Sequence, residues 1–534
     1  MSSSPTVLTV TRQVMRDLDL TVVFGNPGST EQPFLKEWPS DFTYVLGLHE
    51  GSVVGMADGY ARAMRQPVFV NLHTAAGVGN AMGALVTAWH NKAPLIVTAG
   101  QQTREMMLLE PLLTNVDATA LVRPYVKLAL ETARAQDAPA ALMRAYAMAV
   151  QAPTGPAFLS FPMDDWDKPA GVTPMARSIG TRLQATPESL RGLADALVGA
   201  LKPALVLGAG VARGSGWADA VALAELLRCA VFTAPEAEAA SFPEDHALFQ
   251  GELPPAIGPL CEKLQGHDVV AVLGAPVFRY YPYVPGSFLP KGTRLFQITD
   301  DAAEVARAPV GDSVLADPAL AIHVLLGMVA PSDRTPPSPR PSPEAPANAA
   351  TMTADALFHA LAQDKPAEIV LVQESLSSLK DLKSRWPATQ PDSYYTFASA
   401  GLGYGLPAAV GIALAERQSG RKRPVVAVIG DGSFQYASQA LWTAAQLELP
   451  VVFVVPRNGE YAILKSFAKL EETPGVPGLD LPGIDIALIA RGYGCTAVDV
   501  SSPMAAREAF RDALSKPGPT VIVATIDPSV PDLL

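Results

Sequence analysis

The chain has 534 residues, of which 49% are hydrophobic and only 17% are charged, and its formal net charge is −12. This length exceeds what one hydrophobic core organises, so we expect about three domains. The acidic balance argues against a nucleic-acid partner, and the short apolar runs argue against a membrane-spanning segment. The three cysteines are far apart in the sequence, which excludes a disulfide framework or a zinc site and predicts a cytoplasmic protein.

The first segment, residues 1–180, alternates short apolar runs with longer helical patterns. Strands are predicted at Thr21–Phe24, Thr43–Leu46, Val68–Leu72 and Leu95–Ala99, with helices at Glu50–Met64 and Gly79–His90. The patterning lapses near Asp167–Thr186, where we expect a domain boundary.

The second segment, residues 181–328, repeats the alternation, with strands predicted at Ala204–Leu207, Ala230–Thr233 and Val269–Leu273. Residues 329–350 are rich in proline, which removes backbone donors and favours an extended linker. The third segment, residues 351–534, has strands predicted at Glu368–Val372, Val425–Ile429, Val451–Val455 and Thr520–Ala524. This alternation predicts the α/β class, with three doubly wound domains and mainly parallel sheets.

A candidate phosphate and metal site follows the strand Val425–Ile429, in the run Gly430-Asp431-Gly432-Ser433. Glycines let backbone amides approach an anion, and the N-terminus of the helix predicted at 436–446 favours negative charge. Asn458 follows the next strand, so Asp431, Asn458 and the carbonyl of Glu460 are expected to meet at one sheet edge. Gly-Asp-Gly-Ser alone is as typical of an ordinary turn, but the second strand end favours an oxygen-rich Mg²⁺ site.

The run from Gly430 to Asn458 resembles the thiamin-diphosphate motif, with Arg457 where many members have a first asparagine. The chain, apart from the linker and much of the middle segment, is similar to the benzoylformate decarboxylase family of thiamin-dependent 2-oxo-acid decarboxylases. Matching stretches include Phe24-Gly25-Asn26-Pro27-Gly28-Ser29, Asn71-Leu72-His73, Leu112-Leu113-Thr114-Asn115-Val116-Asp117 and Gly274-Ala275-Pro276-Val277-Phe278-Arg279-Tyr280. The resemblance implies a pyrimidine-binding domain (1–180), a central domain without a nucleotide (181–328) and a diphosphate- and Mg²⁺-binding domain (351–534).

The resemblance also implies roles for residues of the first segment. Glu50 would contact N1′ of the aminopyrimidine and activate the cofactor, although a glutamate at a helix N-terminus is also favoured by the helix dipole. His73 would transfer protons, since histidine changes charge near neutral pH. Ser29 would bind the substrate, and Asn26 and Pro27 would lie against the cofactor.

In the third segment the resemblance places Leu402 as the wedge that bends the cofactor and the carbonyl of Ala400 at its 4′-amino group. The remaining residues implied to bind the cofactor are Gly430, Gly432, Ser433, Tyr461 and Ser377. Those implied to line the substrate pocket are Ser29, Leu112, Leu113, Tyr281, Ile463, Phe467 and Leu479. Leucine in such a stretch is equally typical of ordinary core.

Two departures from the family pattern concern the substrate side of the cofactor. Tyr281 stands where the family has a second histidine, and a phenol is a weaker acid–base group at neutral pH. Ile463 stands where the family has a smaller residue, which predicts a reshaped pocket.

The function predicted is decarboxylation of an aromatic 2-oxo acid, most simply benzoylformate, to an aldehyde and CO₂ through a thiamin ylide and an enamine. A carboligase of the acetolactate-synthase type, a decarboxylase of another 2-oxo acid and a non-catalytic cofactor-binding protein remain alternatives. An NAD-dependent oxidoreductase is disfavoured, because the glycines after Gly208 and Gly210 do not follow the dinucleotide fingerprint. The family relationship implies a homo-oligomer, a tetramer built from dimers with shared active sites.

Overall fold

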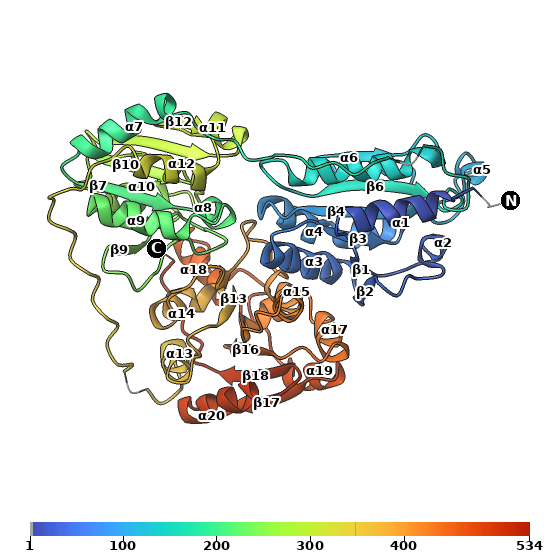
Figure 1. Ribbon diagram of the computed structural model, residues 1–534. Helices are drawn as coiled ribbons and strands as arrows, with labels where there is room; N and C mark the ends of the chain where they lie inside the picture. The colour runs from blue at the N-terminus through green and yellow to red at the C-terminus, as the bar shows by residue number, and fades with distance from the viewer. Residues whose placement is uncertain (1–3, 173, 348, 534) are drawn as a thin grey trace.

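The computed structural model describes residues 4–172, 174–347 and 349–533 (Figure 1). It contains three six-stranded sheets, one in each of three successive domains, and every strand pair in them is parallel. Parallel strands need crossover connections, so helices cover the faces of each sheet and the central strands are apolar throughout. The predicted fold class is confirmed.

The N-terminal sheet has the strand order β2-β1-β3-β4-β6-β5. Its strands are β1 (Val22–Gly25), β2 (Thr43–Leu46), β3 (Val68–Leu72), β4 (Leu95–Gln101), β5 (Ala129–Glu131) and β6 (Ala157–Pro162). The helices are α1 (Val7–Asp17), α2 (Gln32–Leu35), α3 (Glu50–Met64), α4 (Thr74–His90), α5 (Arg104–Met107) and α6 (Ala138–Val150).

The central sheet has the order β12-β11-β10-β7-β8-β9. Its strands are β7 (Pro203–Leu207), β8 (Ala230–Thr233), β9 (Phe249–Glu252), β10 (Val269–Leu273), β11 (Arg294–Thr299) and β12 (Asp312–Leu315). The helices are α7 (Pro187–Gly199), α8 (Ala209–Arg213), α9 (Trp217–Leu227), α10 (Ile257–Lys263), α11 (Ala302–Arg307) and α12 (Pro318–Leu326).

The C-terminal sheet has the order β14-β13-β15-β16-β18-β17. Its strands are β13 (Val370–Glu374), β14 (Tyr394–Tyr395), β15 (Val425–Ile429), β16 (Val451–Arg457), β17 (Thr496–Val500) and β18 (Thr520–Thr525). The helices are α13 (Ala354–Ala362), α14 (Leu379–Arg385), α15 (Gly405–Gln418), α16 (Asp431–Phe434), α17 (Ala440–Gln446), α18 (Ala462–Leu470), α19 (Ile486–Gly492) and α20 (Pro503–Leu514).

The N-terminal and C-terminal domains pack through α3 and α15, which lie side by side in Figure 1. Glycines permit this approach: a Cβ on Gly59 would lie 2.3 Å from the Ala408 carbonyl oxygen, and one on Gly411 would lie 1.9 Å from that of Met56. The buried residues of both domains consequently form one continuous apolar cluster. The two domains are therefore held as one unit.

Two predicted helices differ in the structure. The helix predicted at Gly79–His90 begins earlier, at Thr74, with His73 as its N-cap residue. The helix predicted at 436–446 begins later, at Ala440 (α17), because residues 435–439 form turns after the short helix α16. The proline-rich segment is extended, and two of its arginines bind the central domain: Arg334 donates to the carbonyls of Ala200 and Leu197, and Arg340 to that of Glu244.

Candidate functional site

The C-terminal domain gathers its predicted site residues at the carboxyl ends of β13, β15 and β16, which are neighbours in the sheet. Ser377 lies in the turn after β13, Asp431 follows β15, and Asn458 follows β16. Carboxyl ends of neighbouring parallel strands form the usual binding edge of an α/β sheet. The topology thus brings three sequence-distant segments to one edge.

Asp431 joins two of these strand ends. Its Oδ1 accepts from the Gly432 amide (2.9 Å) and its Oδ2 from the Gly459 amide (2.7 Å). Asn458 Oδ1 in turn accepts from the Glu460 amide (3.1 Å). Burial raises the pKa of the Asp431 carboxyl, against the lowering effect of these amides. The Asp431 carboxylate is therefore bonded to the segment 458–460, which carries the Asn458 side-chain amide and the Glu460 backbone.

This set differs from a side-chain metal cluster. Within residues 4–172, 174–347 and 349–533, no three histidine, cysteine, aspartate or glutamate side chains come together to hold an ion. The Glu460 side chain points elsewhere, to Lys465, which also pairs with Asp480 (2.7 Å). The donors left for a cation here are carboxylate, side-chain amide and backbone carbonyl oxygens. Mg²⁺ binds such a set of ligands when phosphate oxygens complete its coordination shell.

Gly432 makes room for an aromatic ring beside this edge. A Cβ at this position would lie 2.4 Å from Cε1 of Tyr461. The Tyr461 amide donates to the Leu479 carbonyl (2.8 Å), which ties the start of α18 to the loop that carries Leu479. Gly430 and Ser433 flank the same turn, at the start of α16. Gly432 is therefore needed for the close packing of Tyr461 on the turn after β15.

The segment that carries Ala400 and Leu402 is held in an unusual conformation. Ala400 has φ +58° and Gly403 φ +104°. The buried Glu374, at the end of β13, accepts from the Gly403 amide (2.6 Å) and from the Gly405 amide. Burial raises the pKa of Glu374 to about 7, although these amides lower it. Left-handed backbone at a non-glycine residue needs such restraints to persist.

The predicted substrate-pocket residues of this half lie on α18 and on the central domain. Ile463 and Phe467 are one helical turn apart on α18, and the Phe467 ring centroid lies 5.0 Å from that of Tyr281. Tyr281 is 65% exposed, so it is a surface residue beside α18 and does not belong to the core of the central domain.

The N-terminal domain gathers a second group, at the carboxyl ends of β1, β2 and β3. Glu50 is the first residue of α3 and is 9% exposed. Its Oε2 accepts from Asn80 Nδ2 (3.0 Å), and a Cβ on Gly77 would lie 3.0 Å from Oε1. His49 caps the same helix, because its Nδ1 accepts from the Gly51 amide (3.1 Å). Glu50 is therefore fixed between α3 and α4.

His73, which is half-buried, pairs with a buried acid, Glu31, that was not predicted from the sequence. Its Nδ1 lies 2.7 Å from Oε2 of Glu31, which is 1% exposed and also accepts from the amides of Gly28 (3.0 Å) and Gly100 (2.8 Å) and from the Thr30 hydroxyl (2.8 Å). A carboxylate only accepts, so Nδ1 carries the ring proton and Nε2 is free to exchange one.

Three further predicted residues of this half lie on the loop that precedes Glu31. Ser29 and Pro27 are exposed and Asn26 is half-buried, all in the loop after β1. Gly28 permits the approach of the histidine, since a Cβ there would lie 2.0 Å from His73 Nδ1. Glu31 follows the predicted site residues Asn26, Pro27 and Ser29 closely in the sequence, and this nearness could have marked it as a candidate site residue. Nothing in the pattern marked Glu374, since only the fold brings it to residues 403–405.

Leu112 and Leu113 lie on the loop that follows α5. Helix α5 lies at one end of the molecule, away from α18 (Figure 1). Leu112 is 89% exposed, and the neighbouring Leu108, Leu109 and Val116 are also exposed. A run of exposed apolar side chains is typical of a surface that another molecule covers. The two groups of predicted pocket residues are thus separated within one chain.

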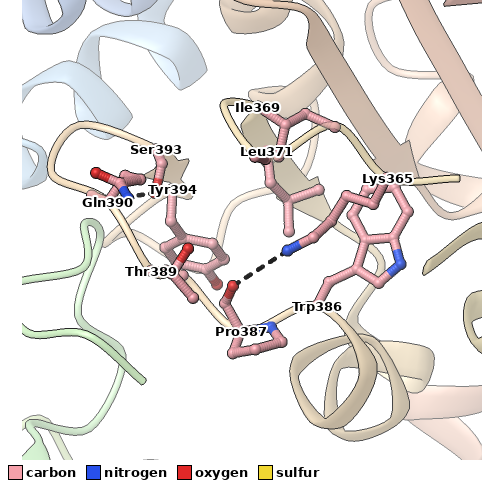
Figure 2. Close-up of a pocket in the computed structure, with 11 residues that line it drawn as sticks. Lys365, Ile369, Leu371, Trp386, Pro387, Thr389, Gln390, Ser393 and Tyr394 are labelled. Atoms are coloured by element: carbon pink, nitrogen blue, oxygen red, sulfur yellow. Dashed lines mark hydrogen bonds between the residues drawn. The ribbon is translucent and has the colours of Figure 1, made fainter. Parts of the chain in front are cut away.

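Two other cavities contain none of the predicted site residues. A cavity of about 20 Å³, lined by Lys365, Leu371, Trp386 and Tyr394, has room for about one water (Figure 2). A larger cavity of about 300 Å³ lies between the three domains, and four of its cations pair with carboxylates: Arg62 with Asp58, Lys92 with Glu304, Arg182 with Asp317 and Arg213 with Glu238.

The glycines after β7 also have a packing reason. A Cβ on Gly208 would lie 2.5 Å from that of Ala275, and one on Gly210 would lie 2.8 Å from Gly274 Cα. They let α8 approach the end of β10.

In the described residues, no helix is long and apolar enough to cross a membrane.

Comparison with known proteins agrees with this geometry. Residues 6–121, 190–325 and 379–524 match the families described as the N-terminal TPP binding, central and C-terminal TPP binding domains of thiamine pyrophosphate enzymes. A benzoylformate decarboxylase of Pseudomonas aeruginosa is 45% identical over 98% of this chain and 100% of its own length.

Two solved structures are similar over nearly the whole chain. A benzoylformate decarboxylase from Polynucleobacter necessarius has a TM-score of 0.97 and 48% identity, covering 98% of this chain and 99% of its own. A thiamine diphosphate-dependent 4-hydroxybenzoylformate decarboxylase of Rhodococcus jostii RHA1 has a TM-score of 0.95 and 42% identity, covering 98% and 100%. The chain belongs to the benzoylformate decarboxylase family of thiamine pyrophosphate enzymes.

Proposed function

We propose that the protein decarboxylates an aromatic 2-oxo acid, benzoylformate, to benzaldehyde and CO₂. The observation that carries this proposal is the 45% identity with a benzoylformate decarboxylase over 98% of the chain. The geometry supports it, because Glu50 and the His73–Glu31 pair lie in one domain and the oxygen-rich edge at Asp431 in another.

The residues at Asp431 fit Mg²⁺ and a diphosphate. The donors are a carboxylate, an amide oxygen and a carbonyl, and Gly430, beside them, has no atom closer than 3.6 Å to the position of a Cβ. Asp431, Asn458 and the Glu460 carbonyl would hold the cation. Ser433, Ser377 and Tyr461 would lie against the diphosphate, Leu402 would support the bent cofactor, and the Ala400 carbonyl would accept from its aminopyrimidine. Thiamin diphosphate, when bound, supplies an electron sink for the carbanion left by loss of CO₂.

The chain's own residues would handle substrate and protons. Glu50 would hold N1′ of the aminopyrimidine through its carboxyl group, with Asn26 and Pro27 alongside. Ser29 would bind the substrate carboxylate. His73, whose Nδ1 proton is directed to Glu31, would exchange a proton through Nε2 with the reacting carbon or oxygen. Leu112, Leu113, Ile463, Phe467, Leu479 and Tyr281 would enclose the aryl ring.

We also propose that each active centre is shared between two copies of the chain. His73 stands before α4, while Thr87, fourteen residues later on this helix, contacts Ser399 beside Ala400. With a rise of about 1.5 Å per residue these two points are about 20 Å apart. Because the reacting atoms of one cofactor are only a few ångströms apart, a second copy must supply the other half.

The proposal includes a homotetramer of two such dimers, in the cytoplasm, with a small-molecule substrate as the only further partner. Exposed Leu112 and its apolar neighbours support association, and three buried free cysteines fit a reducing compartment. Sedimentation equilibrium tests the assembly: a mass of four chains is expected, and a monomer that is fully active would contradict the shared centre.

The activity is tested by assay with benzoylformate, thiamin diphosphate and Mg²⁺. The wild-type enzyme is expected to form benzaldehyde. Glu50→Gln should lose at least a hundredfold in activity, and the activity of Asp431→Asn should no longer saturate as the Mg²⁺ concentration is raised. No turnover of benzoylformate by enzyme that turns over another 2-oxo acid would refute the substrate.

4-Hydroxybenzoylformate is a second candidate substrate, favoured by the 42% identity with a decarboxylase of that compound. Tyr281 places an exposed phenol beside Phe467, where the family pattern has a histidine. The ratio of kcat/KM for the two acids, measured in one competition assay, decides between them.

A further inference from the structure

Two side chains at the C-terminal end of α4 contact the segment that carries Ala400 and Leu402. Asn91, the C-cap residue of α4, accepts through Oδ1 from the Ala398 amide (2.9 Å). Thr87 Oγ1 lies 2.9 Å from Ser399 Oγ, and Ser399 Oγ accepts from the Gly401 amide (3.1 Å). These contacts join the N-terminal domain to a C-terminal-domain segment more than 300 residues away in sequence.

Asn91 is itself held by a second buried side chain. It is 1% exposed, and its Nδ2 donates to Asp58 Oδ2 (3.0 Å) on α3. With Oδ1 turned to Ala398 and Nδ2 turned to Asp58, the amide has a single orientation. A substitution would leave a buried carboxylate and a backbone amide without their partner, which is costly.

The restraint matters because one residue of the segment 398–403 has a strained backbone. Ala400 has φ +58°, and the carboxylate of Glu374 holds the far end of the segment at Gly403 and Gly405. Asn91 and Thr87 hold the near end. Between these two attachments lie the Ala400 carbonyl and Leu402, the two groups that the proposed function places against the cofactor.

We propose that Asn91 and Thr87 are positioning residues for the cofactor-binding segment 398–402 of their own chain. This inference rests on the proposed function and its shared centres. It has a specific consequence: the N-terminal end of α4, with His73 before it, serves one centre of a dimer, while the C-terminal end serves the other centre. Each centre therefore depends on α4 helices from both chains.

Asn91→Ala is expected to weaken thiamin diphosphate binding about tenfold and to lower kcat about tenfold, because the segment is no longer held against the cofactor. Ser399→Ala, which removes the Thr87 contact from the segment side, is expected to act in the same direction by about threefold. His90→Gln, at the exposed neighbouring position on α4, is the matched control and should leave both quantities within twofold.

Hybrid dimers test which centre Asn91 serves, with differently tagged chains purified together. In a hybrid of Glu50→Gln and Asn91→Ala chains, one centre combines both defects, and the other combines an intact catalytic glutamate with an intact held segment. About half of wild-type activity per dimer is expected, with wild-type affinity for thiamin diphosphate in the active centre. In a hybrid of Asp431→Asn and Asn91→Ala chains, both centres carry a defect and no recovery is expected.

The reverse pattern would be recovery of activity in the hybrid of Asp431→Asn and Asn91→Ala chains and no recovery in the hybrid of Glu50→Gln and Asn91→Ala chains. It would show that Asn91 acts on the half of the centre that its own domain forms. It would overturn this inference and leave the shared centre standing. A hybrid of Glu50→Gln and Asp431→Asn chains is the control for sharing. If this control does not recover activity, the shared centre of the proposed function fails and the inference fails with it. Recovery in the Asn91→Ala hybrid also shows that this variant folds.

Discussion

At the scale of single residues, Glu31 is the clearest addition to the site. It accepts from three protein donors besides His73, so its buried carboxyl group is held in one orientation, with Oε2 against Nδ1. In Glu31→Gln the amide can donate to Nδ1 and shift the ring proton to Nε2, so we expect kcat to fall about a hundredfold with little change in KM. Steady-state kinetics with benzoylformate measure this.

The matched control for this substitution is Glu37→Gln, at an exposed position of the same loop region. It should leave kcat within twofold. Thiamin diphosphate affinity should be unchanged in both variants, since neither residue contacts the cofactor. A Glu31→Gln enzyme with normal kcat would show that His73 needs no fixed tautomer.

Tyr281 allows a second prediction, because one substitution removes its hydroxyl alone and another removes the whole ring. Tyr281→Phe keeps the ring beside Phe467, so kcat and KM should stay within threefold of wild type. Tyr281→Ala removes the aromatic contact and should raise KM for benzoylformate about tenfold, equivalent to about 1.4 kcal/mol. Equal losses in both variants would instead assign the function to the hydroxyl.

Sequence reasoning located residues that lie in contiguous motifs and missed those defined by distant contacts. Asp431 and Asn458 could be predicted to meet because each follows an apolar strand, and the Gly459 amide indeed bonds Asp431. Glu374 and Asn91 could not be found from the sequence. The partners of Glu374, Gly403 and Gly405, come close only when the C-terminal domain folds, and the partner of Asn91, Ala398, comes close only through the packing of two domains.

At the scale of elements, periodicity predicted strands well where every residue is buried. Val68–Leu72, Val269–Leu273 and Val425–Ile429 have the predicted bounds. The helix predicted at 436–446 was wrong at its start, because Asp431 initiates a short helix of its own and the chain turns before α17. Caps and turns depend on single side chains, to which a periodic pattern is insensitive.

The packing of α3 on α15 gives a prediction at this scale. Gly411→Ala places a Cβ 1.9 Å from the Met56 carbonyl oxygen, and backbone cannot yield easily. We expect a loss of at least about 2 kcal/mol of stability and a lower thermal midpoint. Gly192→Ala in α7 is the control: nothing lies within 4 Å of its Cβ, so it should be neutral or slightly stabilising. Equal midpoints for the two variants would contradict the close contact.

At the scale of the whole molecule, the three-domain α/β organisation followed from the alternation of elements, but the placement of the domains did not. That placement depends on buried charges that no local pattern reveals. Glu238 of the central domain lies 2.5 Å from Arg213 and 2.9 Å from Arg279, and its carbonyl accepts from Arg62 of the N-terminal domain (2.6 Å). Arg62 also donates to the Thr396 carbonyl of the C-terminal domain (2.8 Å).

This network predicts a pH dependence of stability. Burial alone would raise the pKa of Glu238, but Arg279 and Arg213 outweigh burial and hold the pKa well below its usual value. A carboxyl with a depressed folded pKa stabilises the protein above its unfolded pKa, about 4.3, and loses this contribution as the pH falls toward the folded pKa.

Glu238→Gln should therefore lower the thermal midpoint at pH 7, since it leaves two half-buried arginines without their carboxylate, at a cost of about 3 kcal/mol. The difference from wild type should be constant between pH 7 and 5 and should narrow progressively below about pH 4, where the unfolded wild-type chain begins to take up the proton. Thermal midpoints at one scan rate across this range measure it. A difference that widens below pH 4 would mean that the arginines do not depress the Glu238 pKa.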